Sequence, residues 1–187
     1  CVRSRGLGDV YKRQVTYGTA SRPKHDYVRD NGCDHPIDYH SVDYADEIEK
    51  LTGGRGVDAV LDALGGDDWK KGYALLRPGG TLIAFGWANM AKHGKRKITH
   101  VVGQFTHTPL WTPIRFMRDN KGAAGVNMGH LWAERELAVN AFTELLQLYE
   151  RGAIAPRVDR SFPFDQAADA HAYIEAGQNV GKVLLIP

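Results

Sequence analysis

Short apolar segments alternate with amphipathic ones along the first half of the chain. From residue 15 onward this pattern predicts strands over 15–20, 35–39, 57–64 and 81–86, and helices over 21–31, 43–51 and 67–76. Strands that alternate with helices are typical of a parallel sheet covered by helices on both faces. The predicted fold class is therefore α/β, with a doubly wound parallel sheet.

The second half of the chain has a different pattern. A polar loop over 87–100 precedes an apolar and aromatic segment, 101–117, that Pro109 and Pro113 interrupt. Apolar residues at helical spacing predict an amphipathic helix over 134–150. The remaining elements are a strand and turn over 122–130, a helix over 165–176, and two short strands, RVDRSFPF and GKVLLIP, on either side of that helix.

The order of these elements predicts an incomplete sheet. A doubly wound sheet opens with a strand and a glycine-rich loop, but the strand over 15–20 is followed by features expected after a second strand. Gly6 and Gly8 do not supply the missing loop, because a strand-like segment follows them with no room for a helix. We therefore expect the first strand and its glycine loop to be absent.

Composition excludes several classes of protein. The 187 residues carry a net charge of +2, which gives no signal for nucleic-acid binding. The two cysteines, Cys1 and Cys33, form neither a disulfide framework nor a zinc-binding pair, and His93, His100, His107 and His130 lack metal-ligand spacing. No apolar segment has the length of a membrane span or a signal peptide. We predict a cytoplasmic protein without a metal site, and no convincing catalytic set is present.

The stretch GTASRPK, residues 18–24, is the first candidate binding site. At the end of the second strand of a dinucleotide-binding sheet, an acidic residue binds the ribose of NAD, whereas basic residues bind the 2′-phosphate of NADP. No acid is present here, and Ser21, Arg22 and Lys24 offer a hydroxyl and two cations that suit a phosphate. Gly18 and Thr19 lead into them. The alternative is a capped helix start with solvated charges.

Three further stretches are candidates for contact with a cofactor. Leu64 and Gly65 end one strand, and glycine there lets a flat ligand lie against the backbone. Phe85 and Gly86 end the next strand, where Phe85 could equally be a core residue. The NVGK turn, Asn179–Lys182, precedes the last strand; its alternative is a plain turn with an exposed lysine.

Residues 18–66 strongly resemble the medium-chain dehydrogenase/reductase superfamily, within it the zinc-independent quinone oxidoreductase branch. The stretches HPIDYHSVDYADEI, LLRPGGTLIAFGWANM, MGHLW and NVGKVLLIP are most similar to the synaptic vesicle amine-transport protein group. The resemblance covers residues 15–187 and fits least well over 92–121. It implies a partial NADP-binding Rossmann domain over 15–130 and the C-terminal part of a catalytic lobe over 131–187.

The resemblance also implies an activity and a set of contacts. The family transfers hydride from NADPH to a quinone or an α,β-unsaturated carbonyl, and usually forms homodimers through the edge of the Rossmann sheet, here near 122–129. The catalytic residues would lie in a lobe that this sequence does not contain. The NADPH-binding positions it implies are Gly18, Thr19, Ser21, Arg22, Lys24, Tyr39, Leu64, Gly65, Phe85, Gly86, Asn179 and Gly181.

Two other functions remain open at this point. One is a non-catalytic, membrane-associated NADPH-binding protein, whose basic cluster Lys92–Lys97 would touch anionic lipid. The weaker one is an S-adenosylmethionine-dependent methyltransferase, suggested by LLRPGG alone. Membrane contact is the less favoured interpretation of the basic cluster, since charge runs are usually solvated loops.

The beginning of the chain has an unusual interpretation. Ser4–Gln14, SRGLGDVYKRQ, can be back-translated in one frame into a transposase adapter used to prepare sequencing libraries. We therefore expect residues 1–14 to be non-native and exclude them from the fold. On this interpretation the chain is an N-terminally truncated reductase, inactive by itself.

Overall fold

The computed structural model describes residues 14–89 and 108–187. The chain divides into two compact units, one formed by residues 1–41 with 135–187 and the other by residues 42–134. Each unit is described by itself. Several features noted in the sequence lie outside the described residues: residues 1–13 of the expected adapter, the basic cluster 92–97, and His93, His100 and His107.

The first unit begins with a strand–helix–strand segment. It consists of β1 (Tyr17–Thr19), the 3-10 turn η2 (Arg22–Lys24), α1 (His25–Asp30) and β2 (His35–Ile37). The two strands pair in parallel, with Tyr17 opposite His35 and Thr19 opposite Ile37. Their carboxyl ends therefore meet at one edge of this small sheet.

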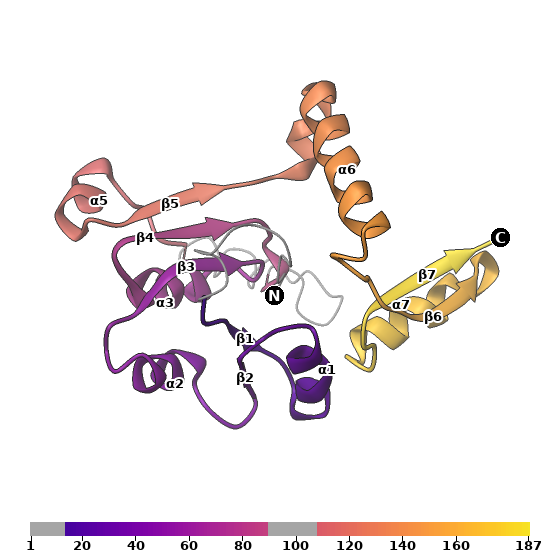
Figure 1. Cartoon of the computed structure of the whole chain (residues 1–187), viewed down its shortest axis with the longest axis horizontal. Helices are drawn as coiled ribbons and strands as arrows, with labels where there is room; N and C mark the ends of the chain where they lie inside the picture. Colours follow the sequence, from indigo (N-terminus) through magenta and orange to yellow (C-terminus); the bar gives the residue numbers. More distant parts are fainter. Residues whose placement is uncertain (1–13, 90–107) are drawn as a thin grey trace. The chain divides into compact units, whose positions relative to one another are not determined.

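The C-terminal part of the first unit repeats this arrangement. It contains α6 (Arg135–Glu150), β6 (Val158–Pro163), η5 (Phe164–Gln166), α7 (Ala167–Glu175) and β7 (Lys182–Ile186). Strands β6 and β7 pair in parallel, and α7 packs against both (Figure 1). Phe162 and Ala170 are buried between the helix and the strands.

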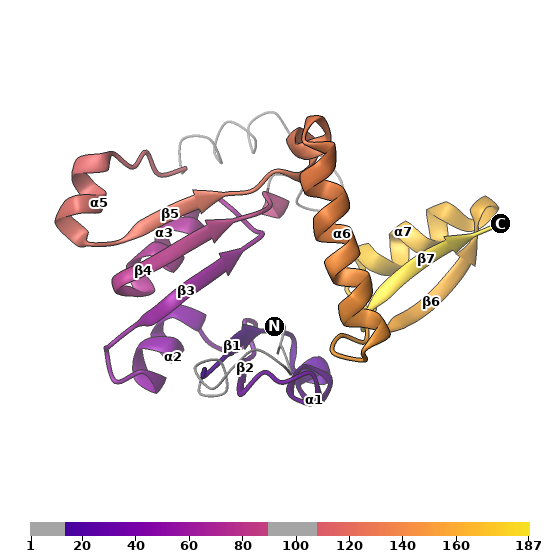
Figure 2. The same ribbon diagram turned by 45° about the horizontal axis from the view of Figure 1, so that its top comes forward.

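The second unit is built on a three-stranded parallel sheet (Figure 2). Its elements are α2 (Tyr44–Leu51), β3 (Val57–Asp62), α3 (Asp67–Leu75), β4 (Leu76–Ala84) and β5 (Gly122–Gly125), with the strand order β3-β4-β5. Helix α3 packs on β3 and β4. Tyr73, Leu76 and the fully buried Leu82 form the core of this layer.

The predicted α/β class with parallel pairing is confirmed. Each strand–helix–strand segment predicted in the first half is present, and every pairing between described strands is parallel. These strands form three separate sheets rather than one, since β1 pairs only with β2 and β3 only with β4 among the described residues. The sheet is thus incomplete, as expected, while the division into domains at residue 130 stays a prediction.

The segment with two prolines differs from the prediction. Pro113 begins a helix, α5 (Pro113–Asp119), and does not merely interrupt an apolar segment. Thr112 caps it by accepting a hydrogen bond from the Arg115 amide at 3.3 Å, and proline suits the first turn because its missing N–H would be unpaired there. The short turn η4 (Met128–Ala133) was not predicted as a separate element either.

The apolar residues of this segment have two different environments. Trp111 and Phe116 pack against Tyr73, with the rings of Trp111 and Tyr73 stacked at 4.8 Å, and so extend the core. Leu110, Ile114 and Met117 are exposed. Among the described residues 108–117, the apolar side chains are therefore partly core, and Leu110, Ile114 and Met117 are available for a contact with another molecule.

Candidate functional site

The turn after β1 carries the predicted phosphate-binding residues. Ala20 continues the sheet by donating its amide to the Ile37 carbonyl at 3.0 Å. Ser21 then takes an extended conformation, and the Lys24 amide closes a 3-10 turn on the Ser21 carbonyl at 2.9 Å. Pro23 favours this turn through its fixed φ. The fold thus gathers Ser21, Arg22 and Lys24 at the carboxyl edge of β1.

The chemistry of this turn is cationic. The Ser21 hydroxyl makes no capping hydrogen bond, and no acidic residue lies in the turn. Arg22 is exposed and Lys24 half-buried, and neither forms an ion pair with another described residue. A hydroxyl and two cations without an internal partner are a donor set that fits a phosphate group.

His25 stabilises this turn, a role that the sequence analysis did not predict. Its side chain is buried, and its Nε2–H donates to the Ala20 carbonyl at 3.0 Å. The bond joins the first residue of α1 to the end of β1, on the two sides of the Ser21–Lys24 turn. The only sequence signal was a histidine directly after a predicted binding turn.

Tyr39 follows β2 and so lies at the same sheet edge as Ser21. Its ring is half exposed and contacts the His40 ring at a centroid distance of 4.2 Å. Gly18 lies within β1, and a Cβ at this position would be 3.0 Å from the sulfur of Cys33. Gly18 therefore has a packing reason of its own, next to the buried thiol.

The second unit holds the candidates Leu64, Gly65, Phe85 and Gly86. The Phe85 amide donates to the Asp62 carbonyl at 2.9 Å, which continues the β3–β4 ladder beyond the strands. The Asp62 carboxylate, which is buried, accepts hydrogen bonds from the amides of Leu64 at 2.7 Å and Gly65 at 2.9 Å. This turn places Leu64 and Phe85 as exposed apolar side chains at the carboxyl edge of the sheet.

Both glycines of this group have close neighbours. Gly65 has a φ of +82°, and a Cβ there would be 2.2 Å from Cδ1 of Trp87. A Cβ on Gly86 would lie 2.8 Å from the Ala63 carbonyl oxygen. The sequence predicted that a flat ligand would lie against the Gly65 backbone. In this structure the Trp87 indole lies there.

A polar network holds this edge in place, and no motif had indicated it. The Asn89 amide donates to the Gly65 carbonyl at 3.1 Å and to the Asp68 carboxylate at 2.9 Å. The Tyr44 hydroxyl donates to the other oxygen of Asp68 at 3.0 Å. Burial, and then the neighbouring Asp68 charge, raise the pKa of Tyr44 well above its usual value, so the phenol stays protonated and keeps this bond.

The turn before β7 contains the last two candidates. Asn179 donates its side-chain amide to the Gly181 carbonyl at 2.9 Å, within the turn. Gly181 has a φ of +118°, and a Cβ there would be 2.5 Å from the Arg157 carbonyl oxygen, so glycine is required. This turn belongs to the first unit, together with the β1 turn, whereas Leu64, Gly65, Phe85 and Gly86 belong to the second.

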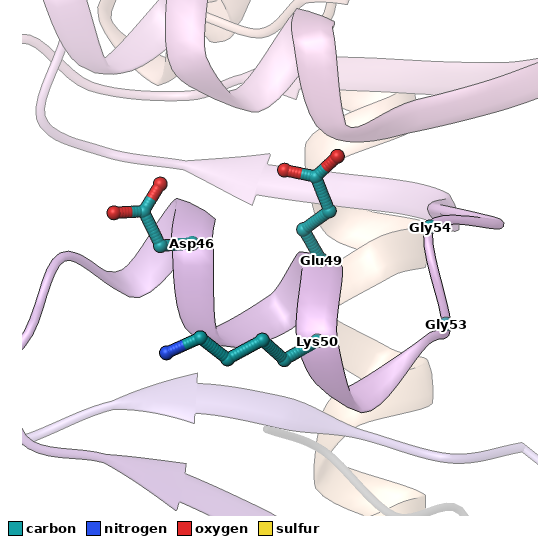
Figure 3. Close-up of a pocket in the computed structure, with 5 residues that line it drawn as sticks. All are labelled: Asp46, Glu49, Lys50, Gly53 and Gly54. Atoms are coloured by element: carbon teal, nitrogen blue, oxygen red, sulfur yellow. The ribbon is translucent and has the colours of Figure 1, made fainter.

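Other kinds of site find little support among residues 14–89 and 108–187. No group of three or more potential metal ligands occurs there. A shallow hollow at the end of α2 is lined by Asp46, Glu49, Lys50, Gly53 and Gly54, all exposed, and the two carboxylates point away from Lys50 (Figure 3). It contains none of the predicted binding residues. No helix of this described part is long and apolar enough to cross a membrane.

Comparison with known proteins places these observations in a family context. The family model described as zinc-binding dehydrogenase matches residues 31–185. The rat synaptic vesicle membrane protein VAT-1 homolog is 42% identical over 173 residues, which cover 92% of this chain and 43% of that protein. The 2-haloacrylate reductase of a Burkholderia species is 30% identical over 176 residues, covering 91% of this chain and 47% of the reductase.

A solved structure agrees with the sequence relatives. The mycobacterial protein Rv1454c, solved in complex with NADPH, superposes with a TM-score of 0.68 and 28% identity, over 92% of this chain and 50% of that one. The chain spans less than half the length of the two sequence relatives.

Proposed function

This chain belongs to the zinc-binding dehydrogenase family, and we propose that it supplies the NADPH-binding part of a reductase. The reaction proposed is hydride transfer from NADPH to a quinone or an α,β-unsaturated carbonyl. The observation that carries the proposal is the acid-free turn with Ser21, Arg22 and Lys24 at the carboxyl edge of a parallel strand. The NADPH bound to the mycobacterial neighbour supports the cofactor, and the haloacrylate reductase supports an activated double bond as acceptor.

In this proposal the cofactor supplies the hydride, and the chain binds and orients it. The two cations and the hydroxyl of the β1 turn bind the 2′-phosphate, and Tyr39 borders the adenosine end. Leu64, Gly65, Phe85 and Gly86 border the nicotinamide half, and the Asn179–Gly181 turn makes a further contact. The proposal assigns no catalytic residue to this chain. Zinc has no role in the proposal.

The test exchanges both cations of the turn for alanine in the longest natural form of the protein that contains residues 15–187. In the Arg22→Ala/Lys24→Ala variant, NADPH binding is expected to weaken about tenfold, the effect of losing charged contacts at a solvent-exposed site. NADH binding is expected to change little, because NADH lacks the 2′-phosphate. Titration calorimetry with both cofactors measures the ratio, and an unchanged ratio would refute this placement of the phosphate.

A matched control uses two cations from a different surface of the chain. Arg115 and Arg118 on α5 are 48% and 72% exposed and pair with Asp119. Replacing them by alanine removes the same net charge, so any loss of NADPH affinity through overall charge alone would appear there as well. We expect no such loss.

Two further parts of the proposal concern activity and assembly. The 187-residue chain alone is expected to show no NADPH turnover, because its sequence contains no glycine-rich dinucleotide loop after a first strand. The free edge of β5, which pairs only with β4 among the described strands, is the proposed edge for a homodimer. Sedimentation measures the assembly. The rate of NADPH oxidation measures the activity.

The remaining candidate functions have weaker support. The membrane-associated alternative depends on the basic cluster 92–97, which lies outside the described residues. The methyltransferase alternative depended on the stretch LLRPGG alone, and family membership favours the reductase. A cytoplasmic location stays a prediction.

A further inference from the structure

We propose that His25 is a positioning residue that favours NADPH over NADH, because it holds Arg22 and Lys24 in place through the turn between β1 and α1. The inference rests on the proposed function, in which these two cations bind the 2′-phosphate. The His25 side chain is buried, only 5% exposed, so it is not itself a contact for the cofactor. It acts on binding through the backbone of the turn.

The His25 imidazole joins the two sides of this turn. Its Nε2 atom lies 3.0 Å from the Ala20 carbonyl oxygen, and a carbonyl can only accept, so Nε2 carries the hydrogen. Ala20 directly follows β1, and its own amide donates to the Ile37 carbonyl of β2 at 3.0 Å. Ala20 is thus fixed on one side by β2 and on the other by His25. The imidazole therefore ties the start of α1 to the anchored end of β1.

The backbone of His25 closes the same turn. Its amide donates to the Arg22 carbonyl, and the Lys24 amide donates to the Ser21 carbonyl at 2.9 Å. The side-chain bond from His25 to Ala20 encloses both of these backbone bonds. Without it, the turn keeps only the bonds of a short 3-10 segment, whose geometry is poorer than that of an α-helix. The two cations would then be less well ordered.

The second ring nitrogen of His25 shows that packing alone does not explain the residue. Nδ1 is buried and has no hydrogen-bond partner among the described residues. A buried polar atom without a partner costs free energy, and an apolar side chain of similar size would avoid that cost. The bond from Nε2 to the Ala20 carbonyl is the polar contact that offsets it. The imidazole is therefore best explained by its bond to the turn.

A loosened turn affects the two cofactors differently. NADPH and NADH differ only in the 2′-phosphate, the group that Arg22 and Lys24 are proposed to bind. A general loss of stability would weaken the binding of both cofactors, whereas displacement of these two cations would weaken the binding of NADPH alone. The ratio of the two affinities thus separates a positioning role from a merely structural one.

The experiment uses variants of the longest natural form of the protein that contains residues 15–187. His25→Leu removes both ring nitrogens, whereas His25→Gln keeps an N–H donor of similar reach. His35→Leu is the matched control, because His35 lies opposite Tyr17 at the other end of the β1–β2 pair. Calorimetry gives the affinities for NADPH and NADH. Hydrogen exchange over residues 18–26 without cofactor reports the turn, and thermal unfolding reports overall stability.

We expect His25→Leu to speed exchange in the turn and to weaken NADPH binding about fivefold, the effect of losing one buried hydrogen bond. NADH binding should not change. His25→Gln is expected to restore most of the NADPH affinity, and His35→Leu to leave the affinity ratio unchanged. In the Arg22→Ala/Lys24→Ala background, His25→Leu should cause no further loss of NADPH affinity, because it acts through cations that are no longer present.

An unchanged affinity ratio in His25→Leu, or an equal loss for both cofactors, would overturn the inference. If His25→Leu does not fold, His25→Asn takes its place with the same expected fall in the ratio, because its shorter amide does not reach Ala20. A ratio lowered by Arg22→Ala/Lys24→Ala but not by the His25 variants would overturn this inference and leave the proposed function standing. A ratio that the double variant does not change would overturn both.

Discussion

Replacing Gly65 by alanine is expected to destabilise the second unit through two separable costs. Gly65 has a φ of +82°, a left-handed conformation that costs an L-residue about 1–2 kcal/mol. The added methyl group would also lie 2.2 Å from Cδ1 of Trp87 and 2.8 Å from its Nε1, and overpacking of this kind costs about 1–3 kcal/mol. The free energy of unfolding should therefore fall by about 2–5 kcal/mol, the sum of these two costs.

Two other glycines separate these costs. Gly79 has a φ of +86° and no described atom within 4 Å of an added Cβ, so Gly79→Ala measures backbone strain alone. Gly86 has no left-handed φ, but its Cβ would lie 2.8 Å from the Ala63 carbonyl, so Gly86→Ala measures close approach alone. Urea unfolding followed by circular dichroism gives the three free energies. Each single-cost variant should lose less stability than Gly65→Ala.

The double variant Gly65→Ala/Trp87→Ala tests the contact itself. Removing the indole should abolish the overpacking cost, so the two substitutions should couple by about 1 kcal/mol or more in a double-mutant cycle. Additive effects, or a Gly65→Ala cost equal to that of Gly79→Ala, would refute the claim that Trp87 makes glycine necessary at this position.

Three further predictions concern the core, the buried thiol and acid stability. Leu82→Ala should lower the free energy of unfolding by about 2–5 kcal/mol, because Leu82 is fully buried, whereas Leu110→Ala, at a side chain 93% exposed, should stay within about 0.5 kcal/mol in the same urea titration. Burial raises the pKa of Cys33, so iodoacetamide should alkylate it more slowly in the folded chain than in urea, and equal rates by peptide mass spectrometry would contradict this. The hydrogen bond from Tyr173 lowers the pKa of Asp159, so its stabilisation should be present above the unfolded value near 3.8 and be lost as the pH falls through the lower folded value. Tyr173→Phe should move that loss to higher pH in unfolding measured between pH 2 and 6, and an opposite shift would contradict the assignment.

Local patterning was sufficient to predict most elements of the fold. The segments at 15–20, 35–39 and 57–64 each contain the strand found there, because short runs of strand-forming residues bounded by turn signals are typical of strands. Asp43 marks a helix start by accepting from the Ala45 amide at 2.9 Å, and Gly152, with a φ of +66°, follows α6. Such signals act within a few residues and need no tertiary context.

The failures involve residues whose meaning depends on partners far away in sequence. The helix that begins at Pro113 is an exception, because its two signals, the Thr112 cap and a proline in the first turn, are local. Asp159 could not be identified in this way, since its partner Tyr173 is brought to it only by the packing of α7 on β6. The same holds for Asn89, which reaches Gly65 and Asp68 only after β3 and β4 have paired.

The candidate cofactor residues differ in how strongly each one supports the presence of a bound cofactor. A Cβ on Gly86 would clash with the Ala63 carbonyl at 2.8 Å, and one on Gly18 would be tight against the Cys33 sulfur at 3.0 Å, so both positions have a packing reason for glycine whether or not a cofactor binds. Arg22 and Lys24 form no ion pair with another residue in the described part of the chain, and Arg22 is exposed. Isolated surface cations are often merely solvated and contribute little to stability. Their placement at the carboxyl edge of β1 becomes informative only if a phosphate binds there, which is why the ratio of NADPH to NADH affinity, and not overall stability, decides the function.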